Sequence, residues 1–398
     1  MGGGASSPAK SGSGSGSSKA GLPHASIPGA EAFFDASFAQ ELIARAGTHR
    51  AEFRENLVGL PPVETLALGR PGGIAALALR SLEASAARDV FAVSAPSDAL
   101  KFVACAEKAD FFTVADGHGP DGAACAAFVR DTLEGNLRSA FKKGREHGIN
   151  NPQAMRNAFL QTDADLLGAK LAAASGASSC AVLLSQSSND GTRKATLTCG
   201  YVGRCQAIVV GWDARKSKLF AKPLDKGAHE PSVPEEKARI VKAGATVATS
   251  SGGASANSEP REGLLAILDT ACGGDEIGDG TTELVFAPGG DGPGHNFSRC
   301  LGDPAARKLG VSGEPSVVDY RVRDHDEFVI IASDGVWDHL DAARIAAICE
   351  GEEDAVVVAH KIVAAAFTAQ LDATPKRADD ATAVVAFLSG VRKGPSAG

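Results

Sequence analysis

Three aspartates in this sequence occupy settings that suit metal binding. Asp116 follows the apolar run FFTVA, Asp334 follows EFVIIAS, and Asp379 comes shortly before ATAVVAFL. If the last strand runs antiparallel to the other two, all three residues lie at one edge of the sheets and their carboxylates converge. Clustered carboxylates repel one another unless cations neutralise them. Oxygen ligands without His or Cys favour Mg²⁺ or Mn²⁺ over zinc.

A single aspartate of this kind would more simply be a capping or turn residue, because Asp-Gly is a common turn dipeptide. Three such sites beside matched strands favour a binuclear metal centre, and Gly117 and Gly119 allow the backbone to approach a ligand. Two cations would polarise a phosphate ester and activate water as the nucleophile. His118 would then protonate the leaving alkoxide. A loop histidine more often has no role, but its place directly after Asp116 and Gly117 favours a catalytic one.

Apolar runs and helical patterns alternate between residues 74 and 388, which is typical of a layered α/β (α+β) fold. Strands are predicted at residues 111–115, 196–210, 327–332 and 382–388, several of them apolar on both faces. Helices are predicted at residues 121–143, 152–174, 235–243 and 342–368.

The chain divides into three parts by composition. Residues 1–30 are rich in Gly, Ser, Ala and Pro and predict a flexible tail. Residues 31–73 predict a helical N-terminal extension. Residues 74–392 make the main domain, and a Gly-, Ser-, Asp- and Thr-rich stretch at about 249–295 predicts a long insertion within it.

Two features of the N-terminal part concern partners. Phe34, Phe38 and Leu42 recur every fourth residue, a stripe that most often packs on the core and less often binds another protein. The chain starts MGGGAS, which fits N-myristoylation at Gly2 with Ser6 at the sixth position; an ordinary Gly/Ser-rich tail is the alternative. One acyl chain would give only reversible membrane association.

Composition excludes several classes of protein. The net charge is −8 and the basic residues do not cluster, so we expect no nucleic-acid partner. The eight cysteines include no CxxC pair, which favours buried thiols in a reducing compartment. No apolar stretch approaches the ~18 residues of a membrane span, and the chain start lacks a secretory signal. We therefore expect a cytoplasmic protein, membrane-associated if Gly2 is acylated.

The sequence over residues 80–388 resembles the PPM (type 2C) family of metal-dependent serine/threonine protein phosphatases. The family's blocks occur in order as FFTVADGHGPDGAACAAFV, AFLQTDADLL, ASSCAVLL, LTCGYVGRCQAIVV, EEKARIVKAGATV, NFSRCLGD, EFVIIASDGVWDHL and DDATAVVAF. The resemblance implies a four-layer α-β-β-α sandwich, with two mainly antiparallel sheets flanked by helices and a metal site at one edge. It also implies Mg²⁺/Mn²⁺-dependent hydrolysis of phosphoserine and phosphothreonine in phosphoprotein substrates by metal-activated water.

The resemblance also implies roles for individual residues. Asp116 resembles the aspartate that bridges both metals, and Gly117 the residue whose carbonyl binds one of them. Asp334 and Asp379 match the remaining ligands of the other metal. His118 matches the general acid.

Of four further positions, one resembles a metal-site residue and three depart from the family's pattern. Asp89, in AARDVFAV, resembles a further metal-site residue that acts through water. Arg88 stands where the family usually has Glu or Gln. Ala84 replaces the family's phosphate-gripping Arg, so Arg88, or alternatively Arg80, is a candidate to hold the substrate phosphate. Arg204 replaces the aspartate of the family's GDSR turn, which serves an accessory metal and orients the histidine.

The sequence leaves two functional hypotheses open. The first is an active phosphatase with two Mg²⁺ or Mn²⁺ ions, supported by the retained aspartates and His118. The second is a pseudophosphatase that acts as a binding or scaffold module with weak or no catalysis, supported by Arg88, Ala84 and Arg204. Nothing in the sequence favours a metal-dependent hydrolase of another class.

Overall fold

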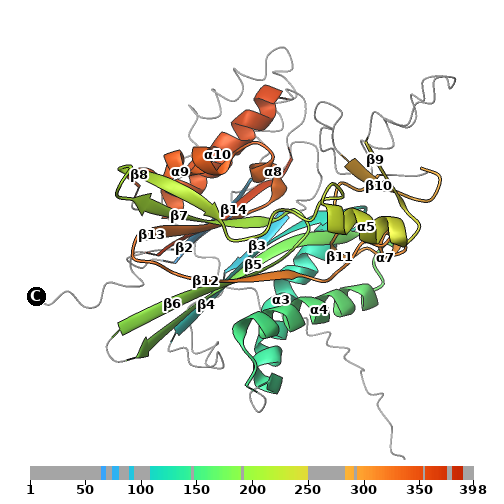
Figure 1. Cartoon of the computed structure of the whole chain (residues 1–398), viewed down its shortest axis with the longest axis horizontal. Helices are drawn as coiled ribbons and strands as arrows, with labels where there is room; N and C mark the ends of the chain where they lie inside the picture. The colour runs from blue at the N-terminus through green and yellow to red at the C-terminus, as the bar shows by residue number, and fades with distance from the viewer. Residues whose placement is uncertain are drawn as a thin grey trace, which may run out of the picture.

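The computed structural model shows two antiparallel sheets packed face to face, with helices covering each outer face (Figure 1). It describes residues 64–68, 74–79, 89–93, 108–144, 148–189, 192–249, 283–290, 294–352, 355–373 and 379–388.

The first sheet runs in the order β1-β2-β14-β13-β7-β8. Its strands are β1 (Glu64–Leu68), β2 (Ile74–Leu79), β14 (Ala381–Phe387), β13 (Asp326–Ala332), β7 (Gln206–Asp213) and β8 (Lys218–Pro223). Helices α9 (Ala342–Cys349) and α10 (Ala355–Ala373) cover its outer face, at the top of Figure 1. In β13, Phe328 and Ile330 pack against these helices, whereas Val329 and Ile331 point toward the other sheet. Both faces are buried, so the strand is apolar from Phe328 to Ala332.

The second sheet runs in the order β12-β6-β5-β4-β3. Its strands are β12 (Ser316–Arg321), β6 (Thr192–Val202), β5 (Gly176–Asn189), β4 (Lys108–His118) and β3 (Asp89–Val93), and the short β11 (Leu301–Gly302) pairs with the start of β5. Helices α3 (Gly122–Gly144) and α4 (Asn151–Gly168) cover its outer face. Phe111 packs on these helices and Phe112 on the opposite sheet.

The remaining elements are short. They are α5 (Pro234–Lys242), β9 (Thr246–Thr249), β10 (Glu283–Phe286), α7 (Pro304–Arg307) and α8 (Asp334–Trp337). Figure 1 shows α5, α7, β9 and β10 together at one end of the sandwich. The expected fold class is therefore confirmed: each apolar core lies between two of four layers, and all the strand pairs of the described residues are antiparallel.

The prediction of a single strand at residues 196–210 was wrong. The stretch is two strands, β6 and β7, which belong to different sheets. The chain turns between them at Gly203, whose φ of 84° lies in the left-handed region that favours glycine. Apolar residues continue on both sides of the turn, so the hydrophobic pattern did not mark it.

Two predicted helices also differ from the structure. The helix expected at 152–174 ends at Gly168, and Lys170 then has a φ of 58°, which no helix allows. The helix expected at 342–368 is two, α9 and α10, and Gly351 between them has a φ of 77°.

The predicted division of the chain is tested only in places. The tail and the helices expected between residues 31 and 57 lie outside the described residues. The range 31–73 does include β1, so its last part is an edge strand and not helix. In the predicted insertion, residues 250–282 and 291–293 lie outside the described residues, and β9 pairs with β10 across the first of these gaps.

Cysteines and membrane spans were also predicted. The described cysteines are all free and buried: Cys125, Cys180, Cys199, Cys205, Cys300 and Cys349. This agrees with buried thiols, while Cys105 and Cys272 lie outside the described residues. Among the helices that the structure describes, none has the length and apolar character that a membrane span requires.

Candidate metal centre

Asp334 and Asp379 lie at neighbouring ends of adjacent strands. Strand β13 pairs antiparallel with β14, with Ala332 opposite Ala383, so the end of one strand lies beside the start of the other. The backbone N–H of Ser333 donates to the carbonyl of Thr382 at 3.1 Å, and the N–H of Thr382 donates to Ser333 Oγ at 3.1 Å. The antiparallel arrangement expected for these two aspartates is therefore present.

Gln370 of α10 holds the two aspartate segments together. Its Nε2 donates to the carbonyl of Gly335 at 2.7 Å, and its Oε1 accepts from the backbone N–H of Asp379 at 2.7 Å. Gly335 itself leaves no room for a side chain, since a Cβ there would lie 2.0 Å from the carbonyl oxygen of Asp380. Both contacts hold Gly335, the residue after Asp334, against the segment that carries Asp379.

Asp116 and Asp89 face each other on the second sheet. In the β3–β4 pair, Asp89 lies directly opposite Asp116, as expected if both belong to one site. Asp116 is half-buried near the end of β4. The next residue, Gly117, packs against the start of α3, where a Cβ would lie 1.9 Å from the carbonyl oxygen of Gly122. Glycine is therefore required for the backbone to follow this path.

The turn between β6 and β7 links the two sheets at the site. The backbone N–H of Arg204 donates to Ser178 Oγ at 3.3 Å, and Ser178 lies opposite Asp116 in the β4–β5 pair. The guanidinium of Arg204 reaches the first sheet, where Nη1 lies 3.6 Å from Asp334 Oδ2 and Nη2 donates to both oxygens of Asp338 at 2.6 and 2.7 Å. Asp116 and Asp334 are therefore connected through two intermediate residues.

His118 is held on three sides. Its Nε2 lies 3.0 Å from Oδ2 of Asp303, and its ring packs on Phe297 with the ring centroids 4.4 Å apart. A Cβ at Gly176 would come within 2.9 Å of the imidazole, so this glycine makes space for the ring. His118 is the last residue of β4 and not part of the loop that the sequence predicted.

Asp303, which contacts Nε2 of His118, is a buried carboxylate. It is fully buried, and its Oδ1 accepts the backbone N–H of Ala306 at 2.8 Å. Burial raises the pKa of Asp303, but the hydrogen bond and charge of His118 and the bond from Ala306 outweigh burial, so the pKa lies below its usual value. An ionised carboxylate only accepts hydrogen bonds. Nε2 of His118 is therefore the protonated nitrogen in this pair.

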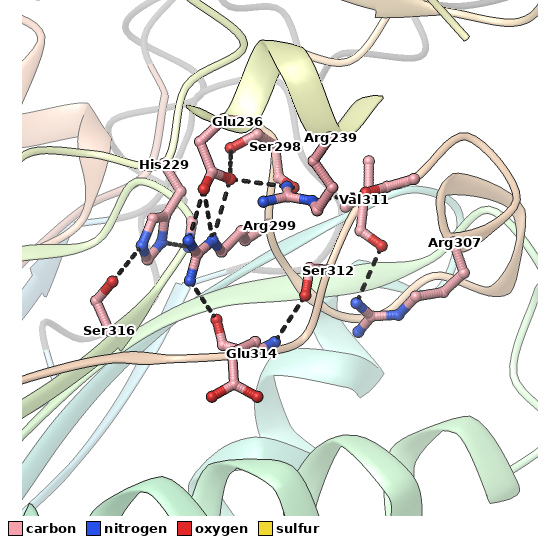
Figure 2. A network of polar contacts seen from close by, with 12 residues as sticks. His229, Glu236, Arg239, Ser298, Arg299, Arg307, Val311, Ser312, Glu314 and Ser316 are labelled. Carbon is pink, nitrogen blue, oxygen red and sulfur yellow. Dashed lines mark hydrogen bonds and ion pairs between the residues drawn. The ribbon is translucent and has the colours of Figure 1, made fainter. Parts of the chain in front are cut away.

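The loop that carries Phe297 and Asp303 is anchored by the polar network in Figure 2. Glu236 of α5 is almost fully buried and accepts from Ser298 Oγ at 2.6 Å and from Arg299 Nε at 3.0 Å. Burial raises the pKa of Glu236, but the hydrogen bonds from Arg299, Arg239 and Ser298 overcome it and lower the pKa to about 2. Glu236 is therefore ionised and paired.

His229 connects this network to the turn before Arg204. Its Nδ1 accepts the N–H of Gly203 at 3.1 Å, so Nε2 carries the proton and donates to Ser316 Oγ at 2.9 Å. Burial and the nearby charge of Arg299 lower the pKa of His229 to about 3, so the ring is neutral. Its backbone carbonyl also accepts the N–H of Ser298, which ties the turn to the loop of Figure 2.

The three aspartates fit a centre for hard divalent cations, because they offer carboxylate oxygens and Gly117 offers a carbonyl. In the part of the chain that the structure describes, their oxygens do not form a group within 4.8 Å of one another. Oxygens that bind two ions about 3.5–4 Å apart need not all lie within that distance of one another, because each oxygen lies about 2 Å from its own ion.

The group of three potential ligands that does lie within 4.8 Å is His118, Cys300 and Asp303. Burial raises the pKa of the Cys300 thiol well above its usual value, which makes it a poor metal ligand. Asp303 and His118 are already bonded to each other. This group therefore gives no support to a zinc site.

The predicted site residues are thus placed to different extents. Asp116, Gly117, His118, Asp334 and Asp379 are all described, and Asp89 is placed by its backbone. Arg88 and Gly2 lie outside the described residues. Sequence reasoning missed Asp303 and Gln370; Asp303 could have been found in the block NFSRCLGD, whereas Gln370 carries no local signal.

Residues 87–372 match the family model described as "Protein phosphatase 2C". Among curated proteins, the chain is 27% identical over 283 residues to "Probable protein phosphatase 2C 64" of Oryza sativa subsp. japonica, covering 70% of this chain and 58% of the relative. It is 31% identical over 238 residues to "Probable protein phosphatase 1N" of Mus musculus, covering 60% of this chain and 47% of the relative. The chain thus spans about half the length of these relatives.

Two solved structures share the fold. The crystal structure of serine-threonine phosphatase 2C from Toxoplasma gondii superposes with a TM-score of 0.57 at 20% identity, over 82% of this chain and 99% of that one. The structure of a C. elegans sex determining protein superposes with a TM-score of 0.52 at 18% identity, over 79% of this chain and 64% of that one. The family model covers well over half of the sequence, and the sandwich agrees with the fold of the two solved structures: the chain belongs to the protein phosphatase 2C family.

Proposed function

We propose that this chain hydrolyses phosphoserine and phosphothreonine in proteins and that it requires Mg²⁺ or Mn²⁺. The observation that carries the proposal is the assembly of the site from both sheets. Gln370 joins the segments of Asp334 and Asp379, and Arg204 with Ser178 links Asp334 to the strand of Asp116.

The residues of the chain divide the work between cation binding and proton transfer. Asp116, Asp334, Asp379 and the carbonyl of Gly117 would hold the cations, with Asp89 contributing through water. When bound, the cations polarise the phosphoryl group and activate water.

His118 would supply a proton to the serine or threonine oxygen as it leaves. Asp303 holds Nε2 of this ring, so Nδ1 is the nitrogen that exchanges the second proton. We also propose that Arg88, which directly precedes β3, contacts the substrate phosphate.

The test is release of phosphate from a phosphothreonine peptide by the full chain with Mn²⁺ and with chelator. We expect turnover only with Mn²⁺, and we expect Asp116→Asn and Asp334→Asn each to abolish it. The matched control is Arg156→Ala on α4, which removes an exposed ion pair with Glu314 and should keep the wild-type rate. Full activity in either aspartate variant would refute the assignment.

One observation favours the second candidate, a pseudophosphatase that binds other proteins. The guanidinium of Arg204 lies beside Asp334, where its positive charge competes with a metal ion for the carboxylate. If no phosphate is released at high protein concentration with Mn²⁺, and the protein is folded, the scaffold hypothesis replaces the enzymatic one.

We further propose a cytoplasmic location with reversible membrane association through an acyl group on Gly2. Co-expression with an N-myristoyltransferase should add about 210 Da to the chain after removal of Met1, the mass of a single myristoyl chain. An unchanged mass would remove the membrane proposal.

A further inference from the structure

We infer that Arg204 is a fixed cation built into the centre, and that its guanidinium takes the carboxylate pair Asp334–Asp338 in place of a divalent ion. The chain would then bind one ion fewer than its carboxylates could hold. This inference concerns ion binding and does not depend on turnover.

The two carboxylates lie on one turn of helix. Asp334 begins α8, and the N–H of Asp338 donates to the Asp334 carbonyl at 2.9 Å. Residues four apart in a helical turn lie on the same face, so the two negative charges are neighbours. Such a pair needs a positive partner, which could be a divalent cation or a basic side chain.

Arg204 supplies that partner with favourable geometry. Nη2 donates to both oxygens of Asp338 at 2.6 and 2.7 Å, and Nη1 lies 3.6 Å from Asp334 Oδ2. The Arg204 side chain is 13% exposed and that of Asp334 11% exposed, so water screens the contact between these two less than a surface pair, whereas Asp338 is 37% exposed. A guanidinium keeps its proton at any physiological pH, so the positive charge is permanent.

The backbone around Arg204 is fixed as well. The N–H of Arg204 donates to Ser178 Oγ, and that of Gly203 donates to Nδ1 of the buried His229. Gly203 has a φ of 84°, and a Cβ there would lie 2.3 Å from Ser178 Oγ. The turn therefore directs the Arg204 side chain toward Asp334 and Asp338 at α8.

A divalent ion at this carboxylate pair and the guanidinium would compete for the same oxygens. Because Asp334 is also a proposed ligand of the main centre, Arg204 reduces the negative charge available there too. Removing Arg204 should therefore open one additional cation site and strengthen binding at Asp334.

The experiment counts Mn²⁺ bound to the metal-stripped full chain by calorimetric titration and by the EPR signal of free Mn²⁺. We expect Arg204→Ala to bind one more Mn²⁺ per chain than the wild type, and we expect the double variant with Asp338→Asn to lose that extra ion. Arg156→Ala, which removes the exposed ion pair with Glu314, should bind as the wild type does. Equal numbers of ions in Arg204→Ala and the wild type, zero included, would overturn the inference.

A second variant keeps the inference testable if Arg204→Ala does not fold. Asp338→Asn alone, with Arg204 present, should bind as many ions as the wild type, because no ion uses this carboxylate. Loss of an ion in Asp338→Asn would show a divalent ion at the pair and contradict the inference. If Arg204→Ala gains an ion while no variant releases phosphate, the inference stands and the proposed enzymatic function fails.

Discussion

At the scale of single residues, the contact between His118 and Asp303 joins positions 185 apart in the chain. A local pattern could identify His118 from its neighbours Asp116 and Gly117. It could not identify Asp303, whose role depends on the return of a distant loop to the end of β4. Asp303 adopts a φ of 50°, and Asn tolerates that backbone conformation as well as Asp does. This makes Asn a substitution that changes the charge and little else.

We predict that Asp303→Asn lowers kcat by roughly 10²-fold and leaves KM within about a factor of two. General acid–base catalysis contributes on the order of 10²–10⁴-fold, and an unpositioned His118 would lose much of it. Steady-state kinetics on a phosphothreonine peptide with Mn²⁺ measure both constants. A purely structural role for Asp303 would instead lower the thermal stability and leave kcat per folded molecule unchanged.

Gly335 offers a second test at this scale. Alanine there would place a Cβ 2.0 Å from the Asp380 carbonyl oxygen and force the Asp334 and Asp379 segments apart. We predict a loss of about 1–3 kcal/mol of unfolding free energy, together with weaker Mn²⁺ binding. The matched control is Gly135→Ala on the exposed surface of α3, where a Cβ meets nothing within 4 Å.

Urea unfolding of the two alanine variants separates steric conflict from backbone entropy. Gly135→Ala should stabilise the chain by about 0.5–1 kcal/mol, because alanine restricts the unfolded state and favours helix. If Gly335→Ala were as stable as the wild type, the close contact with Asp380 would not hold the site together.

At the scale of elements, the apolar patterns predicted β13 and β14 well, found only part of β4 and missed β5, which lies between β4 and β6. Strand β13 was found almost residue for residue, because its apolar run is bounded by acidic residues and by Asp334. The β6–β7 turn was missed because Val202 and Cys205, on either side of it, are both buried and apolar. Periodicity reports burial, and one arginine, Arg204, was too short an interruption of the apolar pattern to mark the turn.

The contact between α5 and the loop at Ser298 yields a prediction about pH. The folded-state pKa of Glu236, about 2, lies below its usual 4.5, so the unfolded chain takes up the proton first as the pH falls. The stabilisation from Glu236 is thus complete above pH 4.5 and is lost between pH 4.5 and about 2. We predict that Glu236→Gln costs about 2–4 kcal/mol at pH 7, because it leaves Arg299 and Arg239 without their buried anion.

Guanidinium unfolding of the wild type and Glu236→Gln at several pH values provides the check. The difference in unfolding free energy should shrink steadily below pH 4.5. A difference that stays constant down to pH 2 would mean that the Glu236 carboxylate is not held in its ionised form by these arginines.

At the scale of the whole molecule, the site lies where the ends of two sheets meet. Strand β14 packs against β3 and β4 of the other sheet, so segments from the middle and the end of the chain come together. The family resemblance implied the sandwich, which is present, whereas the gathering of Asp116, Asp334 and Asp379 around cations stays a prediction. The sequence did not predict that Arg204 would enter the same space, since that depends on the direction in which the β6–β7 turn points its side chain.

The most direct test of the account is a Mn²⁺ titration of the full chain with substitutions on both sheets, Asp116→Asn on the second and Asp334→Asn on the first. If the sheets share one centre, each single variant should lose most of the Mn²⁺ affinity. The double variant should then bind Mn²⁺ only slightly more weakly than the weaker of the two single variants. Two independent losses that add, or wild-type binding in either variant, would contradict a shared metal centre.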